Sequence, residues 1–265
     1  MHFHELRSLS QRSHDKQDEN STLAQPELIT SSMGWTSEDD AEHEQQVQKE
    51  IARRQQRGEP MDLVKAPAGS KKLCKTFWGQ AWCRNLEAYQ HYEARLPRGR
   101  SYLRQGKVYN LEIQAGEISA TVAGSRLYET RILIQPLPQD QWQEIVHQSG
   151  GQVASMLDLL AGKLGDGLMR VLTDPEHGLF PKPKEIRFDC TCPDYADLCK
   201  HSAAVLYGVG VLLDQKPELL FTLRQVDQTE LLRRASQEAA ADLIGPDSGL
   251  EGADLSALFG IDLKS

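Results

Sequence analysis

The sequence predicts an α+β fold: a small antiparallel sheet with helices and a strand–loop–helix module that contains most of the cysteines. Three strand-like runs follow one another within residues 108–135, and apolar residues at helical spacing occur on both sides of them. Three of the five cysteines lie within residues 190–201, directly after a fourth short run. The chain has 265 residues, 39% of them hydrophobic, which is enough apolar material for a core.

The composition favours a cytoplasmic protein without a membrane segment. No apolar run reaches the roughly 18 residues of a transmembrane helix, and the start of the chain lacks the apolar region of a secretory signal. The net charge is −8, but residues 61–131 contain more Lys and Arg than Asp and Glu. A basic middle between acidic ends favours an anionic partner, and an ordinary solvated surface is the alternative that charge alone favours.

Residues 1–69 are predicted to be a disordered acidic tail with one marginal helix. Residues 1–43 are rich in Ser, Gln, Asp, Glu and Asn and show little apolar periodicity. The run from Glu44 to Arg57 has helical propensity but only three apolar side chains to bury. We therefore expect the folded part to begin near Lys72.

Residues 70–140 are predicted to form a helix, a basic loop and a β meander. With Thr76 as a candidate N-cap, the helix is indicated by four side chains at spacings of four, four and three: Trp78, Trp82, Leu86 and Tyr89. The segment RLPRGRSYLRQGKV is predicted to be a loop because Pro and Gly interrupt it. Short turns then separate three expected antiparallel strands, Val108–Gln114, Ile118–Ala123 and Tyr128–Gln135.

Residues 141–235 are predicted to be a helical region that surrounds the cysteine cluster. Helical spacing runs through Trp142–Leu172, with a break at QSGG. A short strand, Ile186–Asp189, leads into the cysteines, and the apolar run after His201 predicts a buried helix. Residues 236–265 are predicted to be a linker followed by a short amphipathic segment.

The cysteines have the spacing Cys190-x-Cys192-x6-Cys199-x-His201. Residues at i and i+2 of a strand point to one side, so the thiolates of Cys190 and Cys192 can face one ion. Cys199 and His201 lie at the start of the predicted helix, and a helix N-terminus favours the negative charge of the thiolates. A closed set of four sulfur and nitrogen ligands is typical of structural zinc, although ligand type leaves iron and copper open. A disulfide across Cys-x-Cys would be strained, and a redox pair would more naturally be Cys-x-x-Cys. We expect one structural zinc ion.

The stretch FDCTCPDYADLCKHSAAVLY resembles the SWIM zinc finger, whose pattern is Cys-x-Cys, a variable gap and Cys-x-His. Other stretches between residues 70 and 265, among them KTFWGQAW, GLFP and LSALFGIDL, are similar to bacterial SWIM-containing proteins. The resemblance implies a zinc finger over about residues 186–213, with Cys190, Cys192, Cys199 and His201 as ligands. It also implies interaction with nucleic acid or protein, and association with a helicase-like ATPase of the chromatin-remodelling type.

Two functions follow as hypotheses. The first is a nucleic-acid-binding accessory factor for DNA or RNA, in which arginines contact phosphate and an aromatic ring stacks on a base. Its candidate residues are Arg95, Arg98, Arg100, Tyr102, Arg104 and Lys107. Against it stands the acidic pI of about 5.5, and a solvated turn explains the same residues.

The second hypothesis is a protein–protein adaptor that docks onto such an ATPase without touching nucleic acid. The C-terminal segment LSALFGIDL has the pattern of a helix that lies in a partner's groove. Its candidate anchors are Leu255, Leu258, Phe259 and Leu263. The alternative is that this segment packs back on its own chain.

We expect no enzymatic activity. The sequence contains no Gly-rich phosphate loop, no recognisable Ser/His/Asp arrangement and no metal set with an open position. The two remaining cysteines, Cys74 and Cys83, are expected to be ordinary buried or half-buried thiols.

Overall fold

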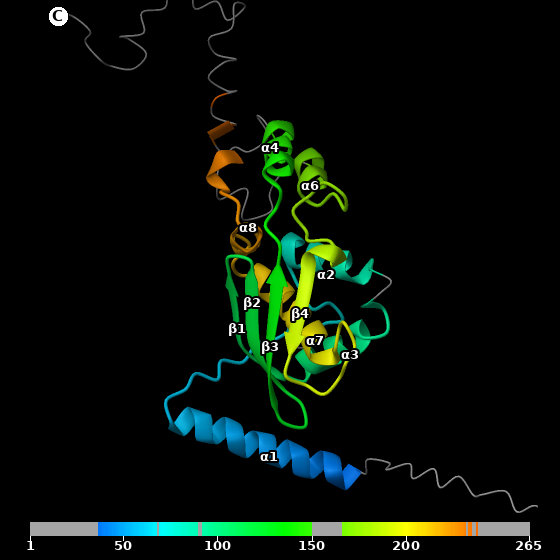
Figure 1. The fold of residues 1–265 in the computed structure, drawn as a ribbon, viewed down its shortest axis with the longest axis vertical. Coiled ribbons are helices and arrows are strands. Elements are labelled where there is room, and N and C mark those ends of the chain that lie inside the picture. Colours follow the sequence, from blue (N-terminus) through cyan, green and yellow to red (C-terminus); the bar gives the residue numbers. More distant parts are fainter. Residues whose placement is uncertain are drawn as a thin grey trace, which may run out of the picture. The chain divides into compact units, whose positions relative to one another are not determined.

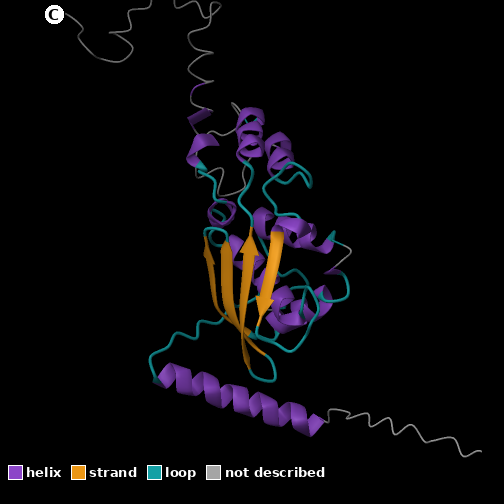
Figure 2. Ribbon diagram, in the orientation of Figure 1, coloured by secondary structure: helices purple, strands orange, loops and turns teal. Residues whose placement is uncertain are grey.

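A four-stranded antiparallel sheet with strand order β1-β2-β3-β4 is the centre of the fold in the computed structural model (Figures 1 and 2). The structure describes residues 37–67, 69–89, 92–149, 166–231, 233, 234 and 237. The strands are β1 (Val108–Gln114), β2 (Glu117–Ala123), β3 (Leu127–Ile134) and β4 (Ile186–Cys190). The predicted α+β class, the meander and the short strand before the cysteines are therefore confirmed, with strand ends that differ by one residue.

Strand β4 belongs to the same sheet as the meander, although about 50 residues separate it from β3. It pairs antiparallel with β3, and the register places Thr130 opposite Cys190 and Ile132 opposite Phe188. Because a sheet fixes backbone position tightly, this pairing holds the first cysteine of the cluster on a rigid element.

Helix α7 (Lys200–Leu213) is the buried helix that the sequence predicts after the cysteines. Its residues are apolar almost all round, and nearly every one is buried, because the sheet lies on one side and helices α2 (Phe77–Glu87) and α3 (Leu96–Arg104) on others. The first residue of α7 directly follows Cys199, so the same helix forms the middle of the core and one border of the cysteine cluster.

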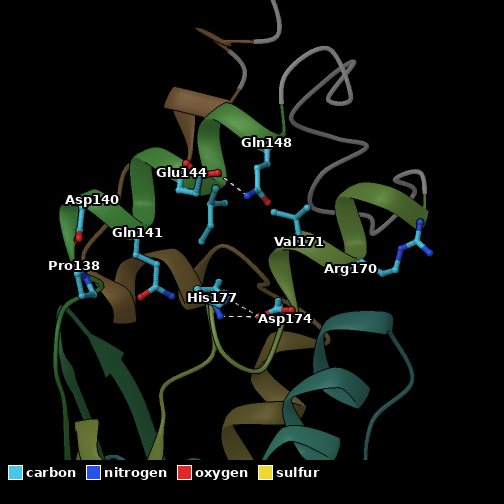
Figure 3. Close-up of a pocket in the computed structure, with 10 residues that line it drawn as sticks. Pro138, Asp140, Gln141, Glu144, Gln148, Arg170, Val171, Asp174 and His177 are labelled. Atoms are coloured by element: carbon cyan, nitrogen blue, oxygen red, sulfur yellow. Dashed lines mark hydrogen bonds and ion pairs between the residues drawn. The ribbon is translucent and has the colours of Figure 1, made fainter.

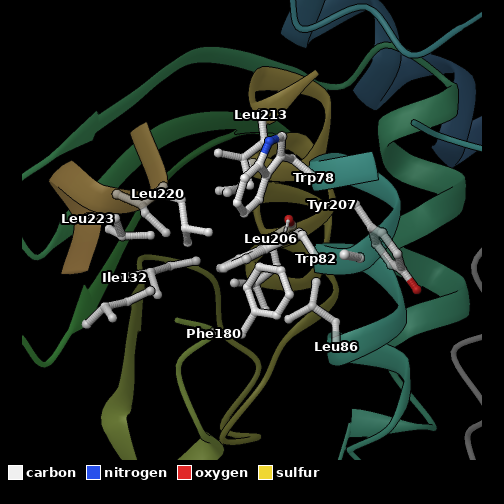
Figure 4. Close-up of a cluster of buried hydrophobic side chains, with 14 of the residues drawn as sticks. Trp78, Trp82, Leu86, Ile132, Phe180, Leu206, Tyr207, Leu213, Leu220 and Leu223 are labelled. Carbon is white, nitrogen blue, oxygen red and sulfur yellow. Dashed lines mark hydrogen bonds between the residues drawn. The ribbon is translucent and has the colours of Figure 1, made fainter. Parts of the chain in front are cut away.

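Helix α2 presents three residues of its predicted stripe, Trp78, Trp82 and Leu86, to α7 (Figure 4), whereas Tyr89 lies beyond the end of the helix at Glu87. Thr76 is the N-cap, as expected, and its hydroxyl accepts a hydrogen bond from the Gly79 amide. Trp82 is fully buried, its indole N–H donates to the Leu206 carbonyl of α7 at 2.7 Å, and its ring meets Phe180 edge-on. The centre of α7 therefore packs against aromatic side chains that lie outside the cysteine cluster of residues 190–201.

The predicted basic loop is wrong, because residues 96–104 form helix α3. Pro97 lies in the first turn, where its missing N–H has no intrahelical acceptor to lose. Gly99 is needed for helix packing: a Cβ there would lie 2.5 Å from the Ala203 Cβ of α7. The two residues that suggested a loop therefore have different roles, one at a helix start and one at a close helix–helix contact.

The folded part begins earlier than the expected Lys72. Helix α1 (Ser37–Gln56) extends the predicted marginal helix toward the N-terminus and includes residues expected to be disordered. Its Val47 and Ile51 form a small apolar cluster with Met61 and Ala123. The chain then runs beside β1, where the Val64 amide donates to the Val108 carbonyl at 2.9 Å.

The remaining elements lie before β4 and after α7. They are α4 (Gln139–Gln148), α6 (Asp166–Leu172), the 3-10 turn η2 (Pro183–Glu185) and α8 (Leu219–Arg224). The helical prediction for residues 150–165 and the amphipathic segment with Leu255, Leu258, Phe259 and Leu263 fall outside the described residues.

Candidate metal centre

The four predicted ligands meet where β4 ends and α7 begins. Cys190 is the last residue of β4, Cys192 follows in the loop, Cys199 is the N-cap of α7 and His201 lies in its first turn. One ligand atom from each residue lies within 4.8 Å of every other. The eight residues 191–198 thus bring Cys199 back beside Cys190. Pairing of β4 with β3 fixes the position of Cys190, and helix α7 fixes the positions of Cys199 and His201.

The distances fit one tetrahedral ion. Zinc bonds of about 2.3 Å to sulfur and about 2.0 Å to nitrogen place neighbouring ligand atoms roughly 3.5–3.8 Å apart. The His201 Nδ1 atom lies 3.9 Å from the Sγ atoms of both Cys190 and Cys199. The other ring nitrogen, Nε2, is buried beside Gly124 and has no hydrogen-bond partner among the described residues. Nδ1 is therefore the nitrogen directed at the ion position.

Local hydrogen bonds favour the thiolate form at the start of α7. The Ser202 amide donates to the Cys199 Sγ at 3.3 Å, as expected for a negative group at a helix N-terminus. The pKa of the Cys199 thiol is lowered to about 3, chiefly by a hydrogen bond from the Cys190 thiol and further by His201 and Ser202, while burial opposes the shift. The same interaction raises the pKa of Cys190.

Two tyrosines flank the His201 ring, and cationic side chains lie close to the rings of both. The Tyr128 ring centroid lies 4.5 Å and the Tyr102 ring centroid 5.5 Å from that of His201. Lys107 and Lys200 each lie 5.1 Å from the Tyr102 centroid. A zinc ion with three thiolates and a neutral imidazole carries a net negative charge, and nearby cations offset it.

A further cation, Arg126, borders the site from the β2–β3 turn. Its guanidinium lies 5.3 Å from the Tyr128 centroid and donates to the Thr191 carbonyl, which lies between two of the cysteines. Arg126 and Lys200 were not among the predicted nucleic-acid-binding residues. The only sequence signal for Lys200 was its position inside the Cys-x-His pair, whereas the closeness of Arg126 depends on the pairing of β3 with β4.

Helix α3 divides the predicted basic residues between two directions. Arg95 forms an ion pair with Asp194 of the cysteine loop at 3.1 Å. Arg100 instead pairs with Glu87 of α2, and Arg104 donates to the Lys71 carbonyl. Arg98 is exposed. Residues at i and i+4 of a helix share a face, so Arg98 lies on the Tyr102 side, whereas Arg100 lies on the α2 side.

The fully exposed aromatic ring near the site is Tyr195, not the predicted Tyr102. Tyr102 is partly buried between two lysines and His201, whereas Tyr195 lies in the loop between Cys192 and Cys199 with a relative exposure of 101%. A tyrosine in a short polar loop between two metal ligands was the signal available in the sequence.

A separate groove of about 710 Å³ lies between α4 and α6 (Figure 3). Its walls carry both acidic and basic side chains, including Glu144 and Arg170. The His177 Nδ1 atom lies 3.4 Å from the Asp174 Oδ1 atom at its edge, and both side chains are exposed. The groove contains none of the residues that the sequence predicts to be functional.

Comparison with known proteins identifies the module. Residues 188–209 match the family profile of the SWIM zinc finger. The uncharacterized protein Rv2102 of Mycobacterium tuberculosis is 32% identical over 186 residues, which are 69% of this chain and 66% of that protein. The chain thus spans just under two thirds of this relative's length.

No solved structure matches the chain. Among the described residues, no helix combines the length and the apolar character needed to span a bilayer. The family match and the convergence of the four ligand atoms agree on the same segment. The chain therefore carries a zinc-binding SWIM zinc finger, which residues 188–209 form at the junction of β4 and α7.

Proposed function

We propose that the protein binds nucleic acid through a basic face beside the zinc finger, defined here as Arg98, Lys107, Arg126 and Lys200. The observation that carries the proposal is the gathering of three of these cations around the two tyrosines that flank His201. Contacts from Lys and Arg to phosphate provide much of the affinity for nucleic acid, and a local basic face supplies them even where the net charge of the chain is negative.

Offsetting the charge of the zinc cluster requires fewer cations than this face contains. The cluster with zinc carries one net negative charge, and Lys200, directly beside two of the ligands, partly balances it. Lys107 and Arg126 come from other parts of the sequence, and Arg98 is exposed on the same side of α3 as Tyr102. These additional charges support a polyanionic partner.

The proposed role of the zinc is structural. Three thiolates and one imidazole complete a tetrahedral set, so no ligand position remains for activating water, and we infer that the module is not an enzyme active site. The metal instead joins the end of β4 to the start of α7. It thereby holds Lys200 and the Tyr195 loop in place.

Because of Tyr195, we expect the protein to prefer single-stranded over double-stranded nucleic acid. An exposed ring in a loop held at both ends by metal ligands suits stacking on an unpaired base, which is worth about 1–3 kcal/mol per base. The companion expectation, that the protein serves a helicase-like ATPase of the chromatin-remodelling type, rests on the family resemblance.

The test is binding of zinc-loaded protein to single- and double-stranded DNA and RNA of one sequence over a range of salt concentrations. We expect Lys107→Ala and Lys200→Ala each to weaken binding and to reduce the salt slope by about one unit. Lys216→Ala is the matched control, because Lys216 is an exposed lysine just beyond the opposite end of α7. Equal effects of Lys200→Ala and Lys216→Ala would contradict the proposal.

A second pair of variants tests the stacking role. Tyr195→Ala should weaken single-strand binding by roughly 5- to 160-fold, whereas Tyr195→Phe keeps the ring and should bind as the wild type does. If the wild-type protein binds no nucleic acid at any salt concentration, the adaptor hypothesis takes its place. Deletion of residues 250–265 then tests docking, with loss of partner capture at unchanged thermal stability as the expected result.

A further inference from the structure

The two cysteines outside the zinc finger form a close pair. The Sγ atoms of Cys74 and Cys83 lie 3.5 Å apart, although nine positions separate the residues in the sequence. Both sulfurs lie against Gly210 of α7, where a Cβ would be 3.0 Å from one sulfur and 3.1 Å from the other. The missing side chain of Gly210 thus makes the space in which the two thiols meet.

A cavity of about 300 Å³ opens onto this pair. Both cysteines line it, together with the acidic Glu87, which pairs with Arg100, and with four cationic side chains: Lys71, Lys72, Arg84 and Arg100. Cys83 is only half-buried and is part of the cavity wall. These observations separate the pair from inert thiols that are enclosed in apolar surroundings.

The two thiols differ in ionisation. A hydrogen bond from Cys74 lowers the pKa of Cys83, and Arg100 and Arg84 lower it further, although burial opposes them. The reverse holds for Cys74, whose hydrogen bond to Cys83 and whose burial raise its pKa. Cys83 is the better placed nucleophile of the two, because it is half-buried whereas Cys74 is buried, and because the thiolate is the reactive form.

A metal site does not explain the pair. Among the described residues, the cluster of at least three ligands suited to a metal is the one at the zinc finger. Two sulfurs at 3.5 Å are instead close to a disulfide, which needs a separation of about 2.05 Å. Cys74 lies in an irregular segment before α2, so a shift of about 1.5 Å on its side does not disturb a helix.

We propose that Cys74 and Cys83 form a reversible peroxide-reactive dithiol, a modification site separate from the zinc finger and independent of nucleic-acid binding. The Cys83 thiolate attacks one oxygen of hydrogen peroxide, the O–O bond breaks, and the leaving hydroxide takes up a proton to become water. The Cys74 thiol then loses its proton and attacks the sulfur of the Cys83 sulfenic acid. The S–S bond forms, the S–O bond breaks, and the oxygen leaves as a second water molecule.

The experiment uses the full chain with its zinc content measured before and after peroxide treatment. Free thiols are then blocked with N-ethylmaleimide, and the protein is digested with trypsin. Cleavage after Lys72, Lys75 and Arg84 releases LCK and TFWGQAWCR, so a disulfide within the pair joins these two peptides. We expect the joined peptides to appear at a peroxide dose that leaves zinc bound, and to separate on reduction. Full alkylation of both peptides, or joining only after zinc is lost, would overturn the proposal.

Variants in which one cysteine of the pair is replaced test the order of the two steps. Cys74→Ser removes the resolving thiol, so a sulfenic acid should accumulate on Cys83 and be trapped by dimedone. Cys83→Ser removes the attacking thiol and should leave Cys74 unmodified and open to alkylation after unfolding. A dimedone adduct on Cys74 in the second variant, with none on Cys83 in the first, would contradict the assigned roles.

Discussion

The two ends of helix α7 each lie beside a group of cysteines, but the groups are held in different ways. At the N-terminal end, three thiols and one imidazole surround a common point, and residues 191–197 between them are exposed or half-exposed. Toward the C-terminal end, two thiols face each other over Gly210, while the neighbouring Trp78 and Trp82 are fully buried.

This difference shows where each end obtains its stability. The zinc finger loop buries few apolar side chains, so the metal must supply much of the free energy that orders it. The other end obtains its order from packed aromatic rings and from close backbone contact. Cysteine therefore has two roles along one helix: metal ligand where packing is sparse, and a close thiol pair beside densely packed aromatic rings.

The largest effect is expected from loss of one zinc ligand. Cys199→Ser or His201→Ala should reduce zinc from one ion per chain to almost none, because structural zinc sites need four protein ligands and each variant leaves three. Limited proteolysis should then cut within residues 191–198 while α2 stays protected. Zinc content and protease resistance equal to those of the wild type would show that the ligands are assigned wrongly.

Truncation at the packed end comes next. Trp82→Ala should lower the free energy of unfolding by about 3–5 kcal/mol, because it leaves a cavity and removes the hydrogen bond to Leu206. Chemical denaturation measures the change, and the folded fraction should still hold one zinc ion. If folded Trp82→Ala protein held clearly less than one zinc ion per chain, packing at one end of α7 would be coupled to metal binding at the other.

A smaller effect is expected where α3 crosses α7. Gly99→Ala places a methyl group 2.5 Å from the Ala203 Cβ, so the helices must separate, at a loss of about 1–3 kcal/mol in unfolding free energy. Ser101→Ala on the exposed side of the same helix is the control and should change stability little. Equal stability of the two variants would contradict the close packing of α3 on α7.

The smallest effect on stability is expected from Tyr195→Ala. The ring is fully exposed, so its removal should change the unfolding free energy by less than about 0.5 kcal/mol and leave zinc content unchanged. This variant is also the exposed-aromatic control for Trp82→Ala. A clear drop in its melting temperature would indicate that the loop contributes packing of its own, and the contrast between the two ends of α7 would weaken.

The sequence predicted those features that depend on local spacing. Alternation predicted the meander, the spacing of Trp78 and Trp82 predicted the buried face of α2, and the spacing of Cys190 to His201 predicted the convergence that the structure displays. In each case, neighbours in the sequence are also neighbours in space. Pattern alone was therefore sufficient.

Features that depend on tertiary contact were missed or predicted wrongly. Gly99 suggested a loop, but glycine is required there because Ala203 of another helix leaves no room for a side chain. The sequence alone does not reveal that contact. Because the segment was predicted to be a loop, the division of its basic residues was missed as well. In the helix that forms there, Arg98 and Arg100 lie on different sides. The contact between Cys74 and Cys83 depends on the position of Gly210, about 130 residues further along the chain.

The most direct test of this contrast is to count zinc and reactive thiols on the same sample. Native protein is titrated with a thiol reagent before and after removal of zinc by a chelator. We predict one zinc ion per chain, and three thiols that become reactive only when the chelator removes it: Cys190, Cys192 and Cys199. Absence of zinc, or the same number of reactive thiols with and without chelator, would contradict a metal-held end of α7.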